Sequence, residues 1–323
     1  MNVHRSWFRL GLTCLVIVSS CFKTSAQAQT FPGGPVKFIT SLSAGIGTEP
    51  AMRILADKLG QMWGQRTVVI NQPGAGGVIA ARAAAAATPN GHTLFMAIAS
   101  TFTVLPVTEP NLAASLNDFV PIGFVGEVPM GIAVSPNLTV NSLPELIALS
   151  QKQPGGLDTA VEFRGGVPHL TAELLRSRTT ANLNPVFYLA GGVAMGDVIA
   201  GRVPVMIQGV SSPIAARQLK LLAIASATRL QSHPDVPTVA ETVPGFTASG
   251  WFVLVAPPGT PAPIAQKISD DLRVALAAPD VKEKFAALGV STRSLSPPQL
   301  QDFIHSEQQL WMPIVKKLGL ETQ

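Results

Sequence analysis

Residues 36–62 read VKFITSLSAGIGTEPAMRILADKLGQM, and this stretch contains the pattern that decides the fold. Its first five residues are rich in β-branched and aromatic side chains, which is typical of a short buried strand. A glycine-containing loop follows, and Thr48 and Pro50 then predict the N-cap and first turn of a helix that runs to about Met62. A strand that leads through a polar loop into a helix is the repeating unit of α/β folds.

The same pattern recurs along the chain. Further strands are predicted at 67–70, 93–98, 132–134, 159–162, 185–187, 203–207, 219–223 and 251–256. Further helices are predicted at 78–87, 142–151, 168–178, 192–201, 260–276, 279–288 and 297–317, with a capping box at Ser142–Glu145 and a cap at Thr260. Ser100 and Thr101 are expected in a loop after the third strand.

Strongly apolar strand character returns at Trp251–Ala256, after a complete second set of strands and helices. We therefore expect one lobe at 31–130 plus 250–323 and a second lobe at 131–249. Two crossings of the chain imply two adjacent hinge strands and a ligand cleft between lobes built on mostly parallel sheets. No repeat and no long linker separates them, so the lobes should form one hinged unit.

The N-terminal segment has the composition of an export signal. Arg5 and Arg9 are followed by an apolar run at 10–18 and by Ala26-Gln27-Ala28, which fits a cleavage site. The run is about half as long as a membrane-spanning helix. We expect residues 1–28 to be a signal peptide cleaved near Ala28, which would place the protein in the periplasm. A lipoprotein anchored through Cys21 is the alternative.

Cleavage there would also change the charge and the cysteine content. The full chain has 23 basic and 19 acidic residues, a formal net charge of +4. Cleavage removes three basic residues, Arg5, Arg9 and Lys23, and no acidic residue. The remaining 20 basic and 19 acidic residues give a net charge of +1. No basic patch then remains for nucleic acid. Both cysteines, Cys14 and Cys21, lie in the removed segment, which excludes a disulfide, a thiolate nucleophile or a cysteine-metal site.

Motifs for catalysis and cofactors are missing from the sequence. There is no nucleophile elbow and no P-loop, and Ile79 stands where a dinucleotide fingerprint needs its third glycine after Gly74 and Gly76. The four histidines beyond residue 28 are far apart, without the spacing of metal ligands. We predict no catalytic residue, no metal and no cofactor.

Six polar or glycine-rich loops follow predicted strands in the two lobes. In open parallel sheets ligands bind at the carboxyl ends of strands, and the free amides of the following helices suit an anion. Tight turns alone could explain any one of these loops, but six in matching positions favour binding. The candidate ligand-binding residues are Ser43, Ala44, Gly45, Gly47, Thr48, Glu49, Ala75, Gly76, Ser100, Thr101, Gly165, Gly166, Val167, His169, Tyr188 and Gln208.

Several longer segments carry a resemblance to a known family. They are FPGGPVKFI (31–39), NQPGAGG (71–77), PNGHTL (89–94), PHLTAEL (168–174), DVPTVAE (235–241) and APPGTP (256–261). In order and spacing they resemble the Bug-type extracytoplasmic solute receptors of tripartite tricarboxylate transporters. The resemblance implies a two-lobed periplasmic-binding-protein-like fold. It also implies capture of a small carboxylate (a di- or tricarboxylate, an acidic amino acid or an aromatic acid) for a membrane permease.

The chain departs from that family's pattern at three places. Ile46 adds bulk where the first loop usually has glycine, and Glu49 replaces a shorter aspartate. The second-lobe loop reads Gly165-Gly166-Val167-Pro168-His169 in place of Gly-Thr-Pro-Ser-His. Gln208 stands where the family often has an acidic residue, which argues against an amino-acid ligand because its ammonium would lack a counter-charge. The identity of the ligand therefore stays open.

Four residues have competing interpretations. His169 either donates to the ligand, orients its loop, or simply caps a helix. Arg164 could donate two hydrogen bonds to a carboxylate or lie exposed on the surface. Trp251 fits the core better than a ligand platform. Glu49 would repel a carboxylate, so we expect it to turn away, cap its helix or bind through water, and Glu49→Gln to leave affinity unchanged or raise it.

These features together predict a monomeric, non-enzymatic periplasmic receptor that passes a small carboxylate to permease subunits of a tripartite tricarboxylate-type transporter. A secreted α/β hydrolase or lyase is the alternative from another class, and the sequence disfavours it because no motif places a nucleophile beside a base. A sensor that binds a solute and docks a signalling partner is a third interpretation. Nothing in the sequence separates sensing from transport.

Overall fold

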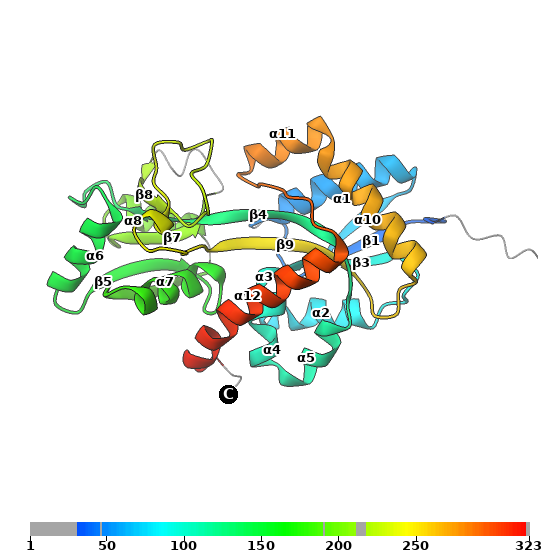
Figure 1. Ribbon diagram of the computed structural model, residues 1–323, viewed down its shortest axis with the longest axis horizontal. Helices are drawn as coiled ribbons and strands as arrows, with labels where there is room; N and C mark the ends of the chain where they lie inside the picture. The colour runs from blue at the N-terminus through cyan, green and yellow to red at the C-terminus, as the bar shows by residue number, and fades with distance from the viewer. Residues whose placement is uncertain (1–30, 46, 190, 211–217, 321–323) are drawn as a thin grey trace, which may run out of the picture.

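The computed structural model describes residues 31–45, 47–189, 191–210 and 218–320. The predicted signal peptide, Cys21 and Ile46 lie outside the described residues. Figure 1 shows an elongated molecule in which two groups of helices and strands are joined by two long strands, β4 (Val120–Val134) and β9 (Ser249–Ala256). Among the helices of the described residues, none is long and apolar enough to cross a membrane.

The first lobe contains three parallel strands in the order β2-β1-β3. Its elements are β1 (Val36–Thr40), α1 (Glu49–Trp63), β2 (Thr67–Asn71), α2 (Val78–Ala85), β3 (Thr93–Ile98), α10 (Ala262–Ala277) and α11 (Pro279–Ala287). Met52, Leu55 and Leu59 of α1 are fully buried, since their spacing puts them on one helix face against Phe38. Gly64 ends α1 in a left-handed conformation that favours glycine.

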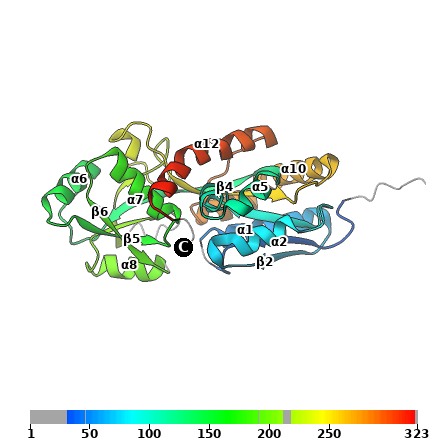
Figure 2. The same ribbon diagram turned by 90° about the horizontal axis from the view of Figure 1, so that it is seen from below.

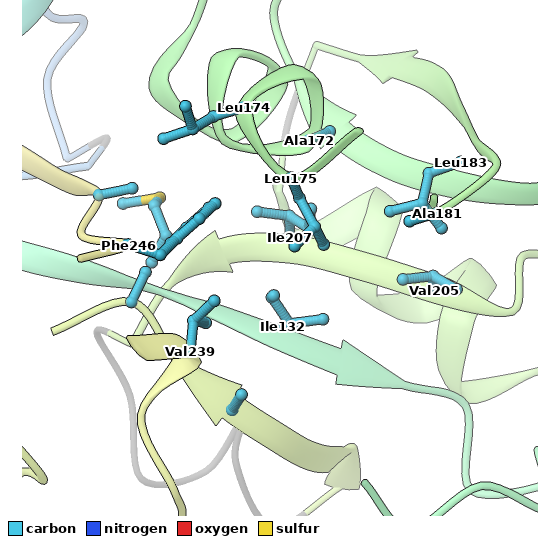
Figure 3. Close-up of a cluster of buried hydrophobic side chains, with 14 of the residues drawn as sticks. Ile132, Ala172, Leu174, Leu175, Ala181, Leu183, Val205, Ile207, Val239 and Phe246 are labelled. Atoms are coloured by element: carbon cyan, nitrogen blue, oxygen red, sulfur yellow. The ribbon is translucent and has the colours of Figure 1, made fainter. Parts of the chain in front are cut away.

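The second lobe is built around a parallel group, with β5 between β6 and β7. Its elements are α6 (Leu143–Lys152), β5 (Leu157–Glu162), α7 (Val167–Arg178), β6 (Leu183–Tyr188), α8 (Gly191–Ile199), β7 (Val205–Gly209) and β8 (Lys220–Ile224). Figure 3 shows its core, in which Leu175 of α7 points toward Ile207 on β7, and Ile132 on β4 belongs to the same cluster. The burial of α7 on the sheet positions the loop that precedes it.

Strand β4 joins the two lobes. Its first part pairs antiparallel with β9 as far as Pro129, which lies opposite Ser249, and β9 pairs with β3. From Met130 onward it pairs with β7 on one side and β8 on the other. The strand order is therefore β2-β1-β3-β9-β4-β7-β5-β6, with β8 beside β4. The two-lobed α/β fold with hinge strands is confirmed. The groups β2-β1-β3 and β7-β5-β6 are parallel, whereas β4 pairs antiparallel with β7, β8 and β9, and β9 pairs antiparallel with β3.

The predicted short strand at 132–134 is only the end of β4, which has 15 residues. Pro121, Gly123, Gly126 and Pro129 hide the strand pattern in the sequence. The register with β9 shifts between Pro121 and Gly123 and between Phe124 and Gly126, so β-bulges absorb these residues within a continuous strand.

Three short helices that the sequence did not predict follow β3. They are α3 (Ala99–Thr103), α4 (Leu105–Thr108) and α5 (Pro110–Asn117). Ser100 and Thr101 therefore lie in a helix, and the predicted loop there is wrong. The helices are short because Pro106 and Pro110 interrupt the chain, and each stands in the first turn of a new helix instead of ending the structure.

Of the three predicted helix caps, one forms the expected capping hydrogen bond. Ser142 accepts a hydrogen bond from the Glu145 N–H at 3.3 Å. Thr48 stands at the N-cap of α1 but its side chain makes no capping bond. Thr260 instead donates to the Pro257 carbonyl at 2.8 Å, so its predicted cap is wrong, and the N-cap of α10 is Pro261.

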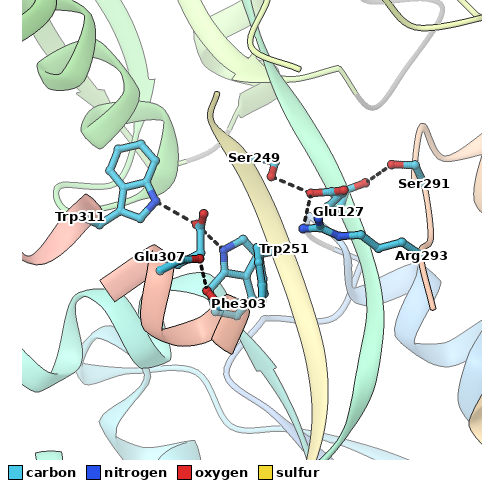
Figure 4. A network of polar contacts seen from close by, with 9 residues as sticks. Glu127, Ser249, Trp251, Ser291, Arg293, Phe303, Glu307 and Trp311 are labelled. Atoms are coloured by element: carbon cyan, nitrogen blue, oxygen red, sulfur yellow. Dashed lines mark hydrogen bonds and ion pairs between the residues drawn. The ribbon is translucent and has the colours of Figure 1, made fainter. Parts of the chain in front are cut away.

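Helix α12 (Pro297–Lys317) runs across the join, as Figures 1 and 2 show from two directions. Leu300 packs into the first-lobe cluster that contains Trp251, whereas Trp311 and Val315 pack into the core of the second lobe. Between them, Glu307 Oε2 accepts hydrogen bonds from Trp251 Nε1 at 2.7 Å and Trp311 Nε1 at 2.9 Å (Figure 4). The core position predicted for Trp251 is confirmed, since only 1% of it is exposed.

Glu307 should make stability depend on pH. Its burial raises its pKa, although the two indole N–H groups oppose this, and nearby Glu127 adds to the rise. The stabilising effect of the protonated form is fully present below the unfolded pKa and is lost as pH rises through the raised one. Glu307→Gln keeps the acceptor without the charge. Its free energy of unfolding, relative to the wild type, should therefore be higher at pH 7 than at pH 4.

Urea denaturation at the two pH values measures this difference. Glu283→Gln is the matched control because Glu283 is exposed on α11. An equal effect of Glu307→Gln at both pH values would mean that Glu307 does not titrate differently in the folded state.

Candidate ligand-binding site

The loop from β1 to α1 presents backbone amides at the edge of the first lobe. Gly45 and Gly47 have φ angles of 75° and 60°, in the left-handed region that a side chain makes costly. Ala44, Gly45 and Gly47 are exposed, and Ser43 and Thr48 are half-buried. The loop leads directly into the N-terminus of α1, where free amides and the helix dipole favour an anion.

Glu49 holds this loop in place. Its side chain is 1% exposed, Oε2 accepts from the Gly45 N–H at 2.9 Å, and Oε1 accepts from Asn71 Nδ2 at 3.0 Å and pairs with Arg53 at 2.7 Å. Burial disfavours the charge, but these hydrogen bonds outweigh it and leave the pKa of Glu49 below its usual value. Asn71 also donates to the Leu42 carbonyl at 2.9 Å. Glu49 is thus occupied within its own loop, and it acts as a positioning residue.

The structure reverses the expected effect of Glu49→Gln. The amide would put N–H groups against donors that the carboxylate now accepts from, so the loop would lose its fixed geometry. We expect the affinity for a carboxylate ligand to fall by up to roughly tenfold, or about 1.4 kcal/mol. Titration calorimetry on this variant and on Glu283→Gln checks the prediction. Unchanged affinity would mean that the loop binds no ligand or needs no support.

A second loop meets the first. Ala75, Gly76 and Gly77 all have positive φ between β2 and α2, and a Cβ on buried Gly77 would lie 3.4 Å from Ser41 Cβ. Ser41 Oγ and Gln72 Oε1, the residues directly after β1 and β2, are buried and have no hydrogen-bond partner within the described residues. Buried polar atoms are rarely left unpaired, so these two mark the first-lobe edge as a binding surface. Neither is among the candidate ligand-binding residues predicted from the sequence, although Ser41 begins the first predicted loop and Gln72 lies in the NQPGAGG segment.

The second-lobe loop is organised by His169. This residue is 4% exposed, and its Nδ1 accepts a hydrogen bond from the Gly165 N–H at 3.0 Å. Burial lowers the pKa of His169 and Arg164 acts in the same direction, whereas Glu173 opposes them. Because Nδ1 accepts the Gly165 N–H it carries no proton, and the lowered pKa favours the neutral imidazole. Of its competing interpretations, the structure supports the one in which His169 orients its loop.

A cavity of about 470 Å³ lies between the lobes. Its wall comes from the loop before α2, from α4 and the residues on either side of it, from the loop before α7 and from the residues that follow α12. The lining residues are Ala75, Gly76, Val104, Leu105, Thr108, Glu109, Arg164, Gly165, Gly319 and Leu320. The structure thus brings Ala75, Gly76 and Gly165 together across the cleft, and it places exposed Arg164 at the same cavity.

The remaining candidates do not line this cavity. Gly166 is the N-cap of α7 and Val167 its first residue. Ser100 is half-buried in α3, whereas Thr101 is 1% exposed. Tyr188 donates to Asp197 Oδ2 at 2.7 Å, so its hydroxyl is engaged. Gln208 Oε1 is buried and unpaired among the described residues.

Two hinged lobes with a cleft between polar loops define a solute-binding protein of the periplasmic-binding-protein type. The model of the tripartite tricarboxylate transporter family receptor matches residues 51–320. The chain belongs to this family, as the resemblance of its loop segments implied.

Relatives and solved structures agree with this assignment. Protein BugT of Bordetella pertussis is 34% identical over 325 residues, covering 99% of each chain. The structure of R. palustris Rpa4515 with adipate has a TM-score of 0.79 at 27% identity, covering 90% of this chain and 98% of that one. MatC from Rhodopseudomonas palustris with bound malate has a TM-score of 0.76 at 27% identity, covering 88% and 100%.

Proposed function

We propose that the protein captures a small carboxylate in the cleft between its lobes and delivers it to the permease subunits of a tripartite tricarboxylate-type transporter. The observation that carries the proposal is the pair of exposed glycine loops at the N-termini of α1 and α2, the first of which Glu49 holds in place. Free amides at helix N-termini bind a carboxylate without a counter-charge. Family members solved with adipate and malate support the same ligand class.

Opening and closing of the lobes would allow the ligand to be captured and released. Strands β4 and β9 lie side by side where the lobes meet, and α12 packs against the cores of both lobes, an arrangement that suits a hinge motion. A ligand that touches both lobes favours the closed state by its extra contacts there. In this proposal the lobes are residues 31–130 plus 250–323 and 131–249. The protein is exported with cleavage near Ala28, acts as a monomer and binds no nucleic acid.

Mass spectrometry of ligand retained through gentle purification tests the proposal. We expect a small carboxylate, recovered unchanged after prolonged incubation with the protein. Conversion of that ligand into a product would favour the hydrolase or lyase instead. A retained molecule without an acid group would contradict the carboxylate assignment.

A further inference from the structure

Three polar side chains form a row at the carboxyl edge of the second-lobe sheet. Tyr188 on β6 is in register with Glu162 on β5. Gln208 lies two residues beyond Met206, which is in register with Ala160, so it stands level with Glu162 on the other side. Residues in register on parallel neighbours point to the same face. Ala160 and Met206 pack against α8, so the row lies on the face that α8 covers.

Gly191, the first residue of α8, lies close to this row. A Cβ placed on Gly191 would lie only 2.6 Å from Glu162 Oε1 and 3.4 Å from Gln208 Oε1. A side chain at position 191 would therefore displace the Glu162 carboxylate, and the carboxylate and the amide oxygen are neighbours around Gly191. The Gly191 N–H donates a hydrogen bond to Glu162.

The row lacks a positive partner. Tyr188 is engaged with Asp197, which also pairs with Arg202. Within the described residues, none of the ion pairs includes Glu162, and Gln208 Oε1 has no hydrogen-bond partner. Burial raises the pKa of Glu162, opposed only by the Gly191 hydrogen bond. A carboxylate and an amide oxygen so placed are acceptors that a cationic donor would satisfy.

We propose that Glu162 and Gln208 form a subsite for a protonated amine, so that the ligand carries an ammonium as well as a carboxylate. This inference rests on the proposed function, in which the first-lobe loops take the carboxylate. It corrects the interpretation that uncharged Gln208 argues against an amino acid. The counter-charge is supplied by Glu162 on the neighbouring strand.

A purely structural role for Glu162 is the competing explanation, because a carboxylate at the N-terminus of α8 also interacts favourably with the helix dipole. Glu162→Gln separates the two roles. It keeps an oxygen acceptor for the Gly191 N–H but removes the charge that an ammonium needs. Glu283→Gln, exposed on α11, changes the net charge equally and serves as the control.

The test is titration calorimetry with probes matched in length. They are propionate and alanine, succinate, malate and aspartate, glutarate and glutamate, and 3-phenylpropionate and phenylalanine. In at least one set the amine-bearing acid should bind at least tenfold more tightly than its unsubstituted partner. Glu162→Gln should abolish that preference without weakening the binding of the unsubstituted acid and without lowering the thermal stability.

Other results overturn the inference in distinguishable ways. Unsubstituted acids that bind as tightly as their amines, or malate binding better than aspartate, would show that no ammonium subsite exists, while leaving the proposed function standing. Equal weakening of all probes together with lower thermal stability would assign Glu162 to capping α8. Failure of every acid to bind would contradict the proposed function itself.

Discussion

Replacing Trp251 with alanine is expected to lower the free energy of unfolding by about 3–5 kcal/mol, the cost of removing a large buried aromatic side chain. The indole is 1% exposed on hinge strand β9. Its ring lies 6.2 Å from that of Phe102 and 5.2 Å from that of Phe303 between centroids. Truncation would open a cavity where β9 meets α12 and would take one hydrogen bond from half-buried Glu307.

Urea denaturation at constant pH measures the loss, and Trp251→Phe separates its two causes. Phenylalanine keeps most of the ring packing but lacks the N–H, so its effect should be clearly smaller. A loss under about 1 kcal/mol for alanine would indicate a site that collapses around the missing ring, and α12 would then not be held through Trp251.

Gly47→Val should weaken carboxylate binding at least tenfold, or about 1.4 kcal/mol. Gly47 has a φ of 60°, and a β-branched residue there would either bear strain of about 1–3 kcal/mol or turn the loop away. Its side chain would also stand among exposed amides at the start of α1. Calorimetry compares this variant with Gly245→Val, which carries a similar strain at a φ of 72° in the second lobe.

The control defines what the result means. If Gly245→Val reduces affinity as much as Gly47→Val, the effect is general destabilisation. If Gly47→Val binds normally, the ligand is held elsewhere in the cleft.

Local sequence patterns predicted most of the fold. The bounds of β1 and β3 agree with the prediction because each is a short apolar segment between turn residues. Those of α12 agree because a proline marks its first turn. These features lie within the segments themselves. Strand β4 and helices α3 to α5 could not be predicted in the same way. In both regions the prolines suggest that the regular structure ends. Pairing with β9 nevertheless keeps β4 continuous, and packing on the sheet stabilises α3 to α5.

In the candidate site too, local features could be predicted from the sequence and features that depend on tertiary contacts could not. Glycine loops after strands are local features, and Ala75, Gly76 and Gly165 do meet at the cavity. The role of Glu49 depends on Asn71, which the β1–β2 pairing brings beside it. Glu162, Ser41 and Gln72 are not among the predicted ligand-binding residues because a single polar residue at a strand end gains meaning only from the register of its neighbours.

The central claim is that backbone amides of the first-lobe loops hold the carboxylate of the ligand. Calorimetric titration with acids and their primary amides, such as succinate against succinamide and glutarate against glutaramide, tests it most directly. We predict that the acid that binds best loses at least tenfold in affinity as its amide, and that Gly47→Val abolishes this difference. An amide that binds as tightly as its acid would contradict the account.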